Sequence, residues 1–568
     1  FYAAIIYIIF ENNYNLFLLL KYVLIKMSAY FLNRRRKTMK KIFASILAVA
    51  LLCGCDSSNK AASTATTSSK SVAIASDTDI SSMNSSVATD GTSFQALGLC
   101  MAGLVQLDSN GLAQPDLAES WDISEDALTY TFHIRKDAKW SDGTALTAND
   151  FVYAWNRLID PNTASDYAFL IDTAASTNTT NAKSWKAEDD YTFVVELSLP
   201  CDYFLTLMAF PSLYPLNEKF VEEQGDQYAL SSDNMLYCGP YIMSSWTVGD
   251  SYTFTKNDSY WDKDSYTENV DDITFRCIQG QSAILDYEAG NLDYVKLTSE
   301  VIEDYKDRDD LVTYLSGFSW YLSFNFGNEY LANKSVREAI AYSIDTSAMC
   351  DSVLKDGSVA LDGFVTKETA INESGEDYRD VAGKVTLSYD TDQAKTKYAD
   401  ACKELGVDSI SLELLYEDAD VSKNVAAYIM DALEKTGFTI TAKCEPKKSR
   451  MEDMNNHEYD IGLTRWGPDY ADPQTYMDLF NSQSTSNSGQ YVSSDYDALI
   501  AKAEVTDAAD STKRWEDFAE AEKVLVNEDT AIIPLYQAGN TALQNTKLTG
   551  IQYHGAGVDN YRHMKLAA

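Results

Sequence analysis

The residues that could perform catalysis are few and scattered. The sequence has four histidines, and none stands in an H-E-x-x-H zinc helix; His457-Glu458-Tyr459-Asp460 matches that motif only in part. It has no G-x-S-x-G nucleophile elbow, no Walker loop, and no G-x-G-x-x-G motif after a predicted strand. We therefore predict a protein that is not an enzyme and that uses no cofactor or metal. A secreted hydrolase on an α/β scaffold is the alternative that such a motif would favour.

The sequence around Cys55 suggests covalent modification of this cysteine. From Met39, two lysines precede the apolar residues 42–52, and a Leu-Cys-Gly-Cys sequence ends at Cys55. A basic start, a short apolar run and small residues are typical of a secretory signal peptide. The end of this segment resembles the lipobox of bacterial lipoprotein signal peptides, which implies that Cys55 carries a diacylglyceryl thioether.

This resemblance divides the start of the chain into three parts. Residues 1–38 are expected not to belong to the mature protein, and residues 39–54 are expected to be the lipoprotein signal peptide. Residues 55–70 are rich in Ser and Thr and lack periodic apolar positions, so they are predicted to be a lipidated, flexible tether. A diacyl or triacyl anchor holds stably, so we expect the protein on the extracellular face of the cell membrane.

A carboxylate stands out in residues 465–473, which read Arg-Trp-Gly-Pro-Asp-Tyr-Ala-Asp-Pro. This segment follows a strand-like stretch at residues 459–463. Taken alone, Asp469 in a loop with Gly and Pro is more often a cap of a loop or helix than part of a binding site. Its function has to be argued from the rest of the chain.

The elements that must position these groups are mixed in type. Alternating apolar residues predict strands at residues 128–134 and 191–197. Apolar residues at three- and four-residue spacing predict helices at residues 336–343, 425–435 and 515–525. Mixed strands and helices without an internal repeat favour α/β lobes with mixed sheets.

Size and charge narrow the class. At 568 residues the chain exceeds what one hydrophobic core normally organises, so we expect more than one domain or a large two-lobed body. The formal net charge of -39 argues against binding to phosphate backbones, and no nucleic-acid partner is expected.

Three consecutive segments resemble a known family. Residues 117–121 (LAESW), 130–143 (YTFHIRKDAKWSDG) and 146–155 (LTANDFVYAW) look like the signature of the family 5 extracellular solute-binding proteins. Residues 157–165 (RLIDPNTAS) resemble its oligopeptide-binding branch, and shorter matches continue to the Ile-Ile-Pro-Leu-Tyr sequence at 532–536. Most of these positions are expected to serve the fold; Trp121, Trp140 and Trp155 are expected to be core residues.

The resemblance implies a fold. It is a two-lobed periplasmic-binding-protein-like α/β fold of type II, in the large form with an extra subdomain. Lobe I would comprise residues 71–113, 237–319 and 541–568, and the extra subdomain would comprise residues 114–236. Lobe II would comprise residues 320–540.

The resemblance also implies a binding site. In peptide-binding members, the Asp of the matching Trp-x-x-Asp-Tyr segment forms a salt bridge with the free α-amino group of the ligand, and that role carries over to Asp469. Trp466, Gly467 and Tyr470 belong to the same segment. Exposed strand edges that pair with an extended peptide are expected along the strand leading to Trp466 and along three further residues, Gly91, Thr92 and Ser93.

Further candidates lie in residues 318–325. Trp320, Tyr321 and Asn325 resemble the family's crossover segment beside the ligand; for the two aromatic residues, a core position is an equally good interpretation. Some family members bind the ligand's C-terminal carboxylate through a basic residue shortly before the Trp. Residues 462–464 offer none, and strand alternation predicts that Arg465 points away from the groove, so preferred peptide length stays open.

The expected partners follow from the family. The protein would capture oligopeptides as a monomer and deliver them to the membrane subunits of an ABC importer, with a lipid anchor in the membrane. Nickel, haem or an oligosaccharide, which other family members bind, is the alternative ligand; the presence of Asp469 favours a peptide.

Overall fold

The computed structural model describes residues 70–172, 179–372 and 374–567. The predicted signal peptide, Cys55 and almost all of the predicted tether lie outside these residues. Within them, no helix is both long enough and apolar enough to span a membrane. The seven cysteines of the described residues are all free thiols.

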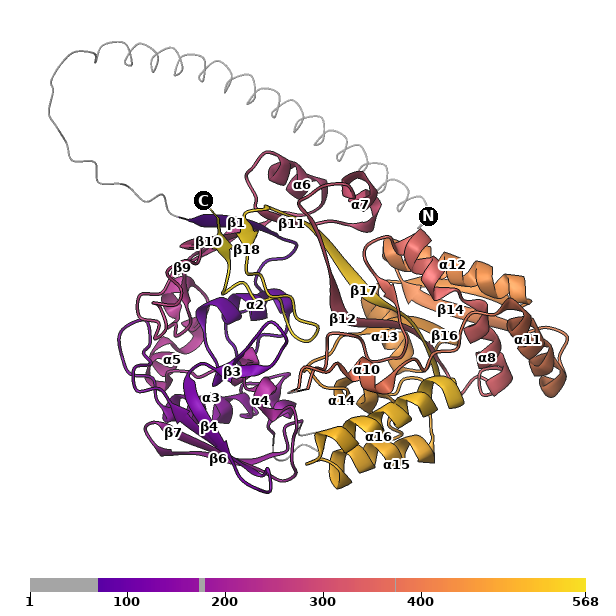
Figure 1. Ribbon diagram of the computed structural model, residues 1–568, viewed down its shortest axis with the longest axis horizontal. Coiled ribbons are helices and arrows are strands. Elements are labelled where there is room, and N and C mark those ends of the chain that lie inside the picture. Colours follow the sequence, from indigo (N-terminus) through magenta and orange to yellow (C-terminus); the bar gives the residue numbers. More distant parts are fainter. Residues whose placement is uncertain (1–69, 173–178, 373, 568) are drawn as a thin grey trace, which may run out of the picture. The chain divides into compact units, whose positions relative to one another are not determined.

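A mixed sheet of eleven strands runs through the described residues (Figure 1). Its middle is formed by two long antiparallel strands, β12 (Leu311–Phe324) and β17 (Ile532–Gln544). Short β13 (Val359–Ala360) pairs with β17 on the same sheet. The remaining order, from one end to the other, is β15 (Thr439–Glu445), β14 (Ser411–Glu417), β16 (Ile461–Trp466), β12, β17, β11 (Tyr294–Lys296), β1 (Ser71–Ser76), β10 (Asp272–Cys277), β9 (Ser251–Lys256) and β8 (Tyr241–Thr247).

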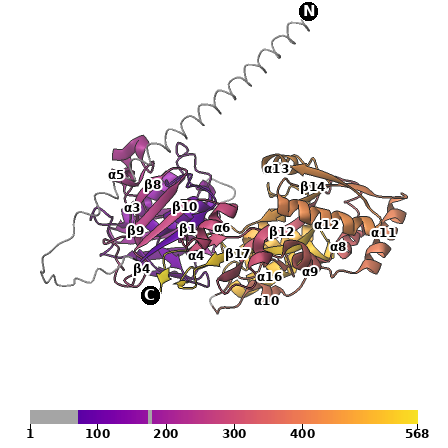
Figure 2. The same cartoon turned by 90° about the horizontal axis from the view of Figure 1, so that it is seen from above.

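The two long strands connect two groups of elements (Figure 2). On one side lie β1, β8, β9 and β10, and on the other lie β14, β15 and β16. The predicted boundaries at 319/320 and 540/541 fall inside β12 and β17, so both crossings between the predicted lobes are made within continuous strands.

A separate four-stranded antiparallel sheet lies within residues 114–236, the range predicted for the extra subdomain. Tyr130 and Phe132 of this sheet are buried, as the alternation of residues 128–134 predicts. Trp140 and Trp155 are fully buried core residues, as predicted, and Trp155 donates a hydrogen bond to the carbonyl of Leu213 at 3.1 Å. The strand order is β4 (Ala118–Ile123), β5 (Thr129–Ile134), β7 (Thr192–Leu197) and β6 (Ala182–Asp189).

Two further strand pairs and the helices complete the described structure. The pairs are β2 (Val105–Leu107) with β3 (Ala113–Pro115) and β18 (Leu548–Thr549) with β19 (Lys565–Leu566). The helices are α2 (Gly91–Cys100), α3 (Ala148–Leu158), α4 (Phe204–Leu207), α5 (Glu218–Gln224), α6 (Gly280–Glu288), α7 (Ser299–Tyr305), α8 (Lys334–Ser343), α9 (Thr346–Met349), α10 (Tyr378–Ala382), α11 (Thr391–Leu405), α12 (Asp420–Thr436), α13 (Lys447–Asn455), α14 (Gln474–Met477), α15 (Ser494–Ala501) and α16 (Ser511–Lys523).

The three predicted helices are confirmed as α8, α12 and α16. Each begins several residues before the predicted start, because the apolar spacing becomes visible only after the capping turn. Asn333 and Asp510 cap α8 and α16 through their side chains. α12 ends at Gly437, whose φ of 125° suits glycine and no other residue type.

The buried apolar side chains form several clusters. One large cluster includes residues of α2, α3 and the four-stranded sheet together with C-terminal residues such as Tyr561 and Met564. Two others are built around the faces of β12 and β16, with Leu322 and Leu463 in one and Tyr321 in the other. The C-terminal residues thus return to pack with the N-terminal part of the chain.

Candidate ligand-binding site

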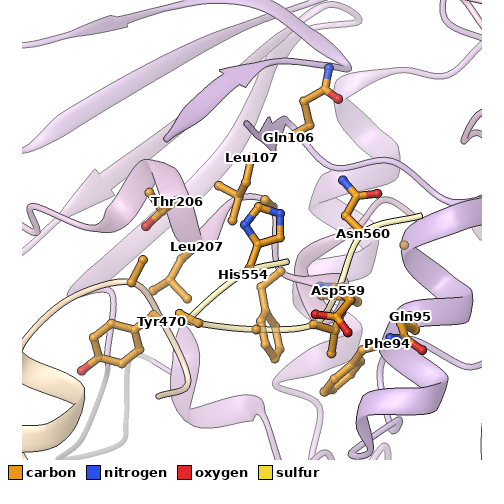
Figure 3. A pocket seen from close by; sticks show the side chains of 18 of the residues that line it. Phe94, Gln95, Gln106, Leu107, Thr206, Leu207, Tyr470, His554, Asp559 and Asn560 are labelled. Carbon is orange, nitrogen blue, oxygen red and sulfur yellow. The ribbon is translucent and has the colours of Figure 1, made fainter. Parts of the chain in front are cut away.

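Two cavities meet beside Asp469. The larger, which we call the groove, has a volume of about 690 Å³. It is lined by α2, by the end of β1, by β12, and by residues that follow β16. The smaller, which we call the apolar pocket, has a volume of about 120 Å³ and lies between α2, α4 and the C-terminal residues 554–562 (Figure 3).

Local structure fixes Asp469 at this junction. The strand β16 ends at Trp466, and Gly467 follows where any side chain would collide with Phe318, since a Cβ there would lie 2.5 Å from the ring. The backbone N–H of Asp469 donates to the hydroxyl of Thr475 at 3.2 Å. The chain therefore turns sharply here and holds the Asp469 side chain between the two cavities.

The carboxylate of Asp469 has no ion-pair or hydrogen-bond partner among the described residues. It is half-buried, and desolvation raises its pKa from 3.8 to about 6. An ionised carboxylate in such surroundings is costly unless a cation or a donor joins it. The site is therefore prepared for a positively charged group.

The next carboxylate in the segment is satisfied internally. Arg514 of α16 donates two hydrogen bonds to Asp472, each of 2.7 Å, and both side chains are buried. Arg514 also reaches Gln474 at 2.8 Å and lies 3.8 Å from Asp202. This network anchors the residues that follow Asp469.

Several predicted site residues line these cavities. Gly91, Thr92, Trp320 and Gly467 line the groove together with Asp469. Tyr470 lines the apolar pocket and stacks on Tyr203, with ring centroids 4.3 Å apart. These residues are far apart in the sequence and are brought together by the fold.

The expectation that residues 91–93 form a strand edge is wrong. Gly91 is the first residue of α2, and Asp90 caps the helix by accepting a hydrogen bond from the backbone of Ser93. Ser93 is fully buried, and its hydroxyl donates to Asp90 at 2.6 Å. An Asp at the N-cap position is a common helix start signal. Asp90 therefore could have predicted this helix from the sequence.

The sequence of this chain matches a family of known role. The family model "Bacterial extracellular solute-binding proteins, family 5 Middle" matches residues 113–488. The dipeptide-binding protein of Lactococcus lactis subsp. cremoris is 32% identical over 87% of this chain and 94% of its own length. This chain belongs to the family 5 extracellular solute-binding proteins.

Solved structures agree with this assignment. The structure of Listeria monocytogenes OppA bound to peptide is 34% identical, covers 88% of this chain and 99% of its own, and has a TM-score of 0.70. The substrate-binding domain of an oligopeptide ABC transporter from Bacillus anthracis is 36% identical over the same shares, also with a TM-score of 0.70. The periplasmic-binding-protein-like fold predicted from the sequence is confirmed.

Besides Ser93, three predicted site residues of this family 5 protein line neither cavity. Tyr321 and Trp466 pack on the opposite face of the sheet from Trp320, in the cluster that contains Phe364 and Phe480. Asn325 is buried, and its amide donates to the carbonyls of His457 and Tyr459 at 3.0 and 2.8 Å. Strand alternation explains the first two, because Tyr321 follows Trp320 and Trp466 follows Arg465.

Arg465 is on the groove side, contrary to the expectation that it points away. It pairs in register with Trp320, and its guanidinium lies 4.8 Å from the centroid of that ring. It also lies 3.6 Å from the carboxylate of Glu417. The groove of this solute-binding protein therefore has a cation on its wall, already held in part by a carboxylate and an aromatic face.

Sequence reasoning missed the C-terminal contribution to both cavities. His554 and Asp559 line the groove and the apolar pocket alike. Asp559 accepts from the hydroxyl of Tyr314 at 3.2 Å and lies 3.8 Å from Lys296. No motif marks these residues, since their place depends on how residues 553–561 fold back across Gly317, whose Cβ position is blocked by Gly555.

In the part of the chain that the structure describes, no group of three or more His, Cys, Asp or Glu side chains is arranged to hold a metal ion.

Proposed function

We propose that this protein is an extracellular receptor that captures oligopeptides and delivers them to an ABC importer. One observation carries the proposal: the Asp469 carboxylate is half-buried, unpaired among the described residues, and placed where the groove meets the apolar pocket. The names of the relatives, a dipeptide-binding protein and a peptide-bound OppA, agree with it.

The free α-amino group of a peptide suits this carboxylate. An ammonium sealed in a protein loses its hydration, and a positioned carboxylate offsets that cost. Binding would in turn give Asp469 the counter-charge that it lacks in the empty protein, and its pKa would fall. Asp469 would thus select ligands with a free N-terminus.

The groove suits the rest of an extended peptide. Its volume of about 690 Å³ lies in the upper part of the range of about 300–1,000 Å³ typical of ligand sites. Its walls include main chain at Gly317 and Gly467 as well as the rings of Trp320 and Phe318. Main-chain recognition with roomy side-chain space allows many peptide sequences to bind.

Transport requires no chemistry by the receptor, and we propose that the protein is not an enzyme. Two lobes, with the boundaries predicted from the sequence, would close over the peptide by bending within β12 and β17. The closed monomer would then present a surface that the membrane subunits of the importer recognise. A lipid on Cys55 and a tether over residues 55–70 would hold it at the cell membrane.

Calorimetry with three ligands tests the peptide claim. We expect binding of a free tripeptide, much weaker binding of the same peptide with an acetylated N-terminus, and no binding of a malto-oligosaccharide. The Asp469→Asn variant should lose about 2–5 kcal/mol of binding free energy, because the ammonium would be buried without its partner.

Asp559→Asn is the matched control, since Asp559 borders the same two cavities but already has Tyr314 and Lys296 beside it. It should lose less affinity than the Asp469 variant. Equal affinity for the free and acetylated peptides would contradict the role given to Asp469. Membrane partitioning of a Cys55→Ser variant would contradict the proposed anchor.

A further inference from the structure

The apolar pocket and the groove share a wall at Asp469, and this arrangement bears on which peptides bind. The argument rests on the proposed function, in which Asp469 holds the α-amino group. The α-carbon that carries this ammonium has two further branches, the peptide carbonyl and the first side chain. Both branches must enter space that borders Asp469, and the two cavities are the spaces available there.

The main chain of the ligand has one suitable route. Only the groove continues along main chain of β12 and of the residues after β16, at Gly317 and Gly467. The apolar pocket is bounded instead by the helices α2 and α4 and by C-terminal residues. When the backbone leaves through the groove, the first side chain is directed into the apolar pocket.

The pocket is built from large apolar side chains. Phe94, Leu107 and Leu207 line it from three different elements, and Tyr470 lies at one side with its ring directed away from the other labelled side chains (Figure 3). Phe210 also lines it and packs edge-on against Phe94, with centroids 5.1 Å apart. Its volume of about 120 Å³ is close to that of an apolar cavity of about 150 Å³ that binds benzene, so it accommodates an aromatic ring such as that of Phe.

Most polar side chains of the pocket are hydrogen-bonded to residues outside its lining. Burial lowers the pKa of His554 below 6.5, so its ring is neutral at pH 7. Arg562, the one Arg or Lys among the described lining residues, donates to Asp116 at 2.9 Å and to the carbonyl of Met101. Gln106 donates to the carbonyl of Pro115, Thr206 to the carbonyl of Tyr203 and Asn560 to Gln552, while Asp559 accepts from the hydroxyl of Tyr314.

Gly98 sets the depth of the pocket. It lies in the middle of α2 and lines the pocket, and a Cβ added to it would meet no heavy atom within 4 Å. Its backbone is helical, so it is not needed for a left-handed conformation. A larger residue at this position would extend into the space that the ligand side chain would use.

We infer that the apolar pocket receives the side chain of the first peptide residue, that it selects large uncharged side chains there, and that Gly98 is a specificity-determining residue. A charged first side chain would enter a space whose own charges are already paired, and it would lose hydration without gaining a partner. An alanine would leave most of the pocket unfilled.

A peptide series tests the preference by calorimetry on the wild-type protein. In X-Ala-Ala tripeptides, Phe or Leu at X should bind roughly 10- to 100-fold more tightly than Ala, Lys or Glu. The same substitutions at the second position should have a smaller effect. Equal affinities across X, or a preference that appears at the second position and not at the first, would overturn the inference.

A pair of variants tests Gly98. Gly98→Leu should weaken binding of Phe-Ala-Ala about tenfold or more and leave Ala-Ala-Ala within about twofold, whereas Gly98→Ala should change neither. An equal loss for both peptides in Gly98→Leu, with an unchanged melting temperature, would overturn the role of Gly98. Failure of every peptide to bind, or indifference to N-terminal acetylation, would contradict the proposed function instead, so the two failures are distinguishable.

Discussion

Asp469 and Asp472 are three residues apart in one segment, and their surroundings are opposite. Asp472 is buried and receives two hydrogen bonds of 2.7 Å from Arg514. Asp469 is only half-buried, yet it has no partner among the described residues, and its pKa is raised to about 6. The carboxylate that the chain satisfies holds the segment in place, and the one that it leaves unsatisfied faces the cavities.

Asp469 also differs from the carboxylates of two other buried ion pairs. Arg379 and Glu522 form a buried pair, as do Arg562 and Asp116. In each, the chain supplies both charges and further hydrogen bonds, for example from the backbone N–H groups of Phe364 and Val365 to Glu522. A half-buried carboxylate that lacks both a counter-charge and hydrogen-bond donors, as Asp469 does among the described residues, points to a partner from outside the chain.

Removing each carboxylate in turn should give the largest effects, with opposite changes in the free energy of unfolding. Asp472→Asn should lower the free energy of unfolding by about 3–5 kcal/mol, because Arg514 would stay buried without its counter-charge. Asp469→Asn should raise the free energy of unfolding at neutral pH, by up to about 3 kcal/mol, since a pKa raised from 3.8 to about 6 means that folding opposes the ionised form.

Urea denaturation of ligand-free protein, refolded after removal of bound peptide, measures both changes. Ligand must be absent because it would stabilise the wild-type protein selectively. Two variants that shift the midpoint in the same direction would show that the carboxylates do not differ as described.

The ionisation of Asp469 should also make peptide affinity depend on pH. The ionised form of Asp469 binds the ammonium, and the empty protein has a pKa of about 6 at this site. Affinity should therefore be constant between about pH 7 and the α-amino pKa of the peptide, about 8, and should fall by up to about 1.4 kcal/mol per unit below pH 6.

Calorimetry of wild-type protein and Asp469→Asn over this range provides the measurement. The variant should show no decline below pH 6 from this site. His554, whose pKa is lowered by burial, and Asp559, whose pKa is raised by burial, border the same cavities, so a decline that persists in Asp469→Asn would assign the pH dependence to one of these two residues.

The sequence predicted the fold class and the segment that bears Asp469, and both predictions depended on long motifs. Strands with clear alternation, such as β5, were predicted within a residue. The same rule placed Arg465 on the wrong face, because alternation gives the relative orientation of neighbours and not which face borders the groove. Only the pairing of Arg465 with Trp320 fixes that.

Other parts of the site could not be predicted from local sequence. His554 and Asp559 lie more than 80 residues after Asp469 in the sequence. They reach the groove only because the chain between them packs against the sheet at Gly317. Tyr470 lines the apolar pocket, but the stacking of its ring on Tyr203, a residue of the predicted extra subdomain, was not predicted. Long-range packing of this kind leaves no periodic signal.

The smallest expected effect concerns that packing of Tyr203 on Tyr470. The two rings are stacked at 4.3 Å with an interplanar angle of 15°, and Arg514 lies 5.6 Å from the Tyr203 ring. Tyr203 therefore links Arg514, which holds Asp472, to Tyr470, the residue next to Asp469. A double-mutant cycle with Tyr203→Leu and Tyr470→Leu should give a coupling of about 0.5–1.5 kcal/mol in the free energy of unfolding.

Tyr203→Phe is the matched control, because it keeps the ring and should keep most of the coupling. If the rings position Asp469 as well as stabilise the fold, Tyr203→Leu should also weaken binding of a free tripeptide but not of its N-acetylated form, since only the former depends on Asp469. A coupling of zero, or an equal loss for both ligands, would show that Tyr203 does not position Asp469.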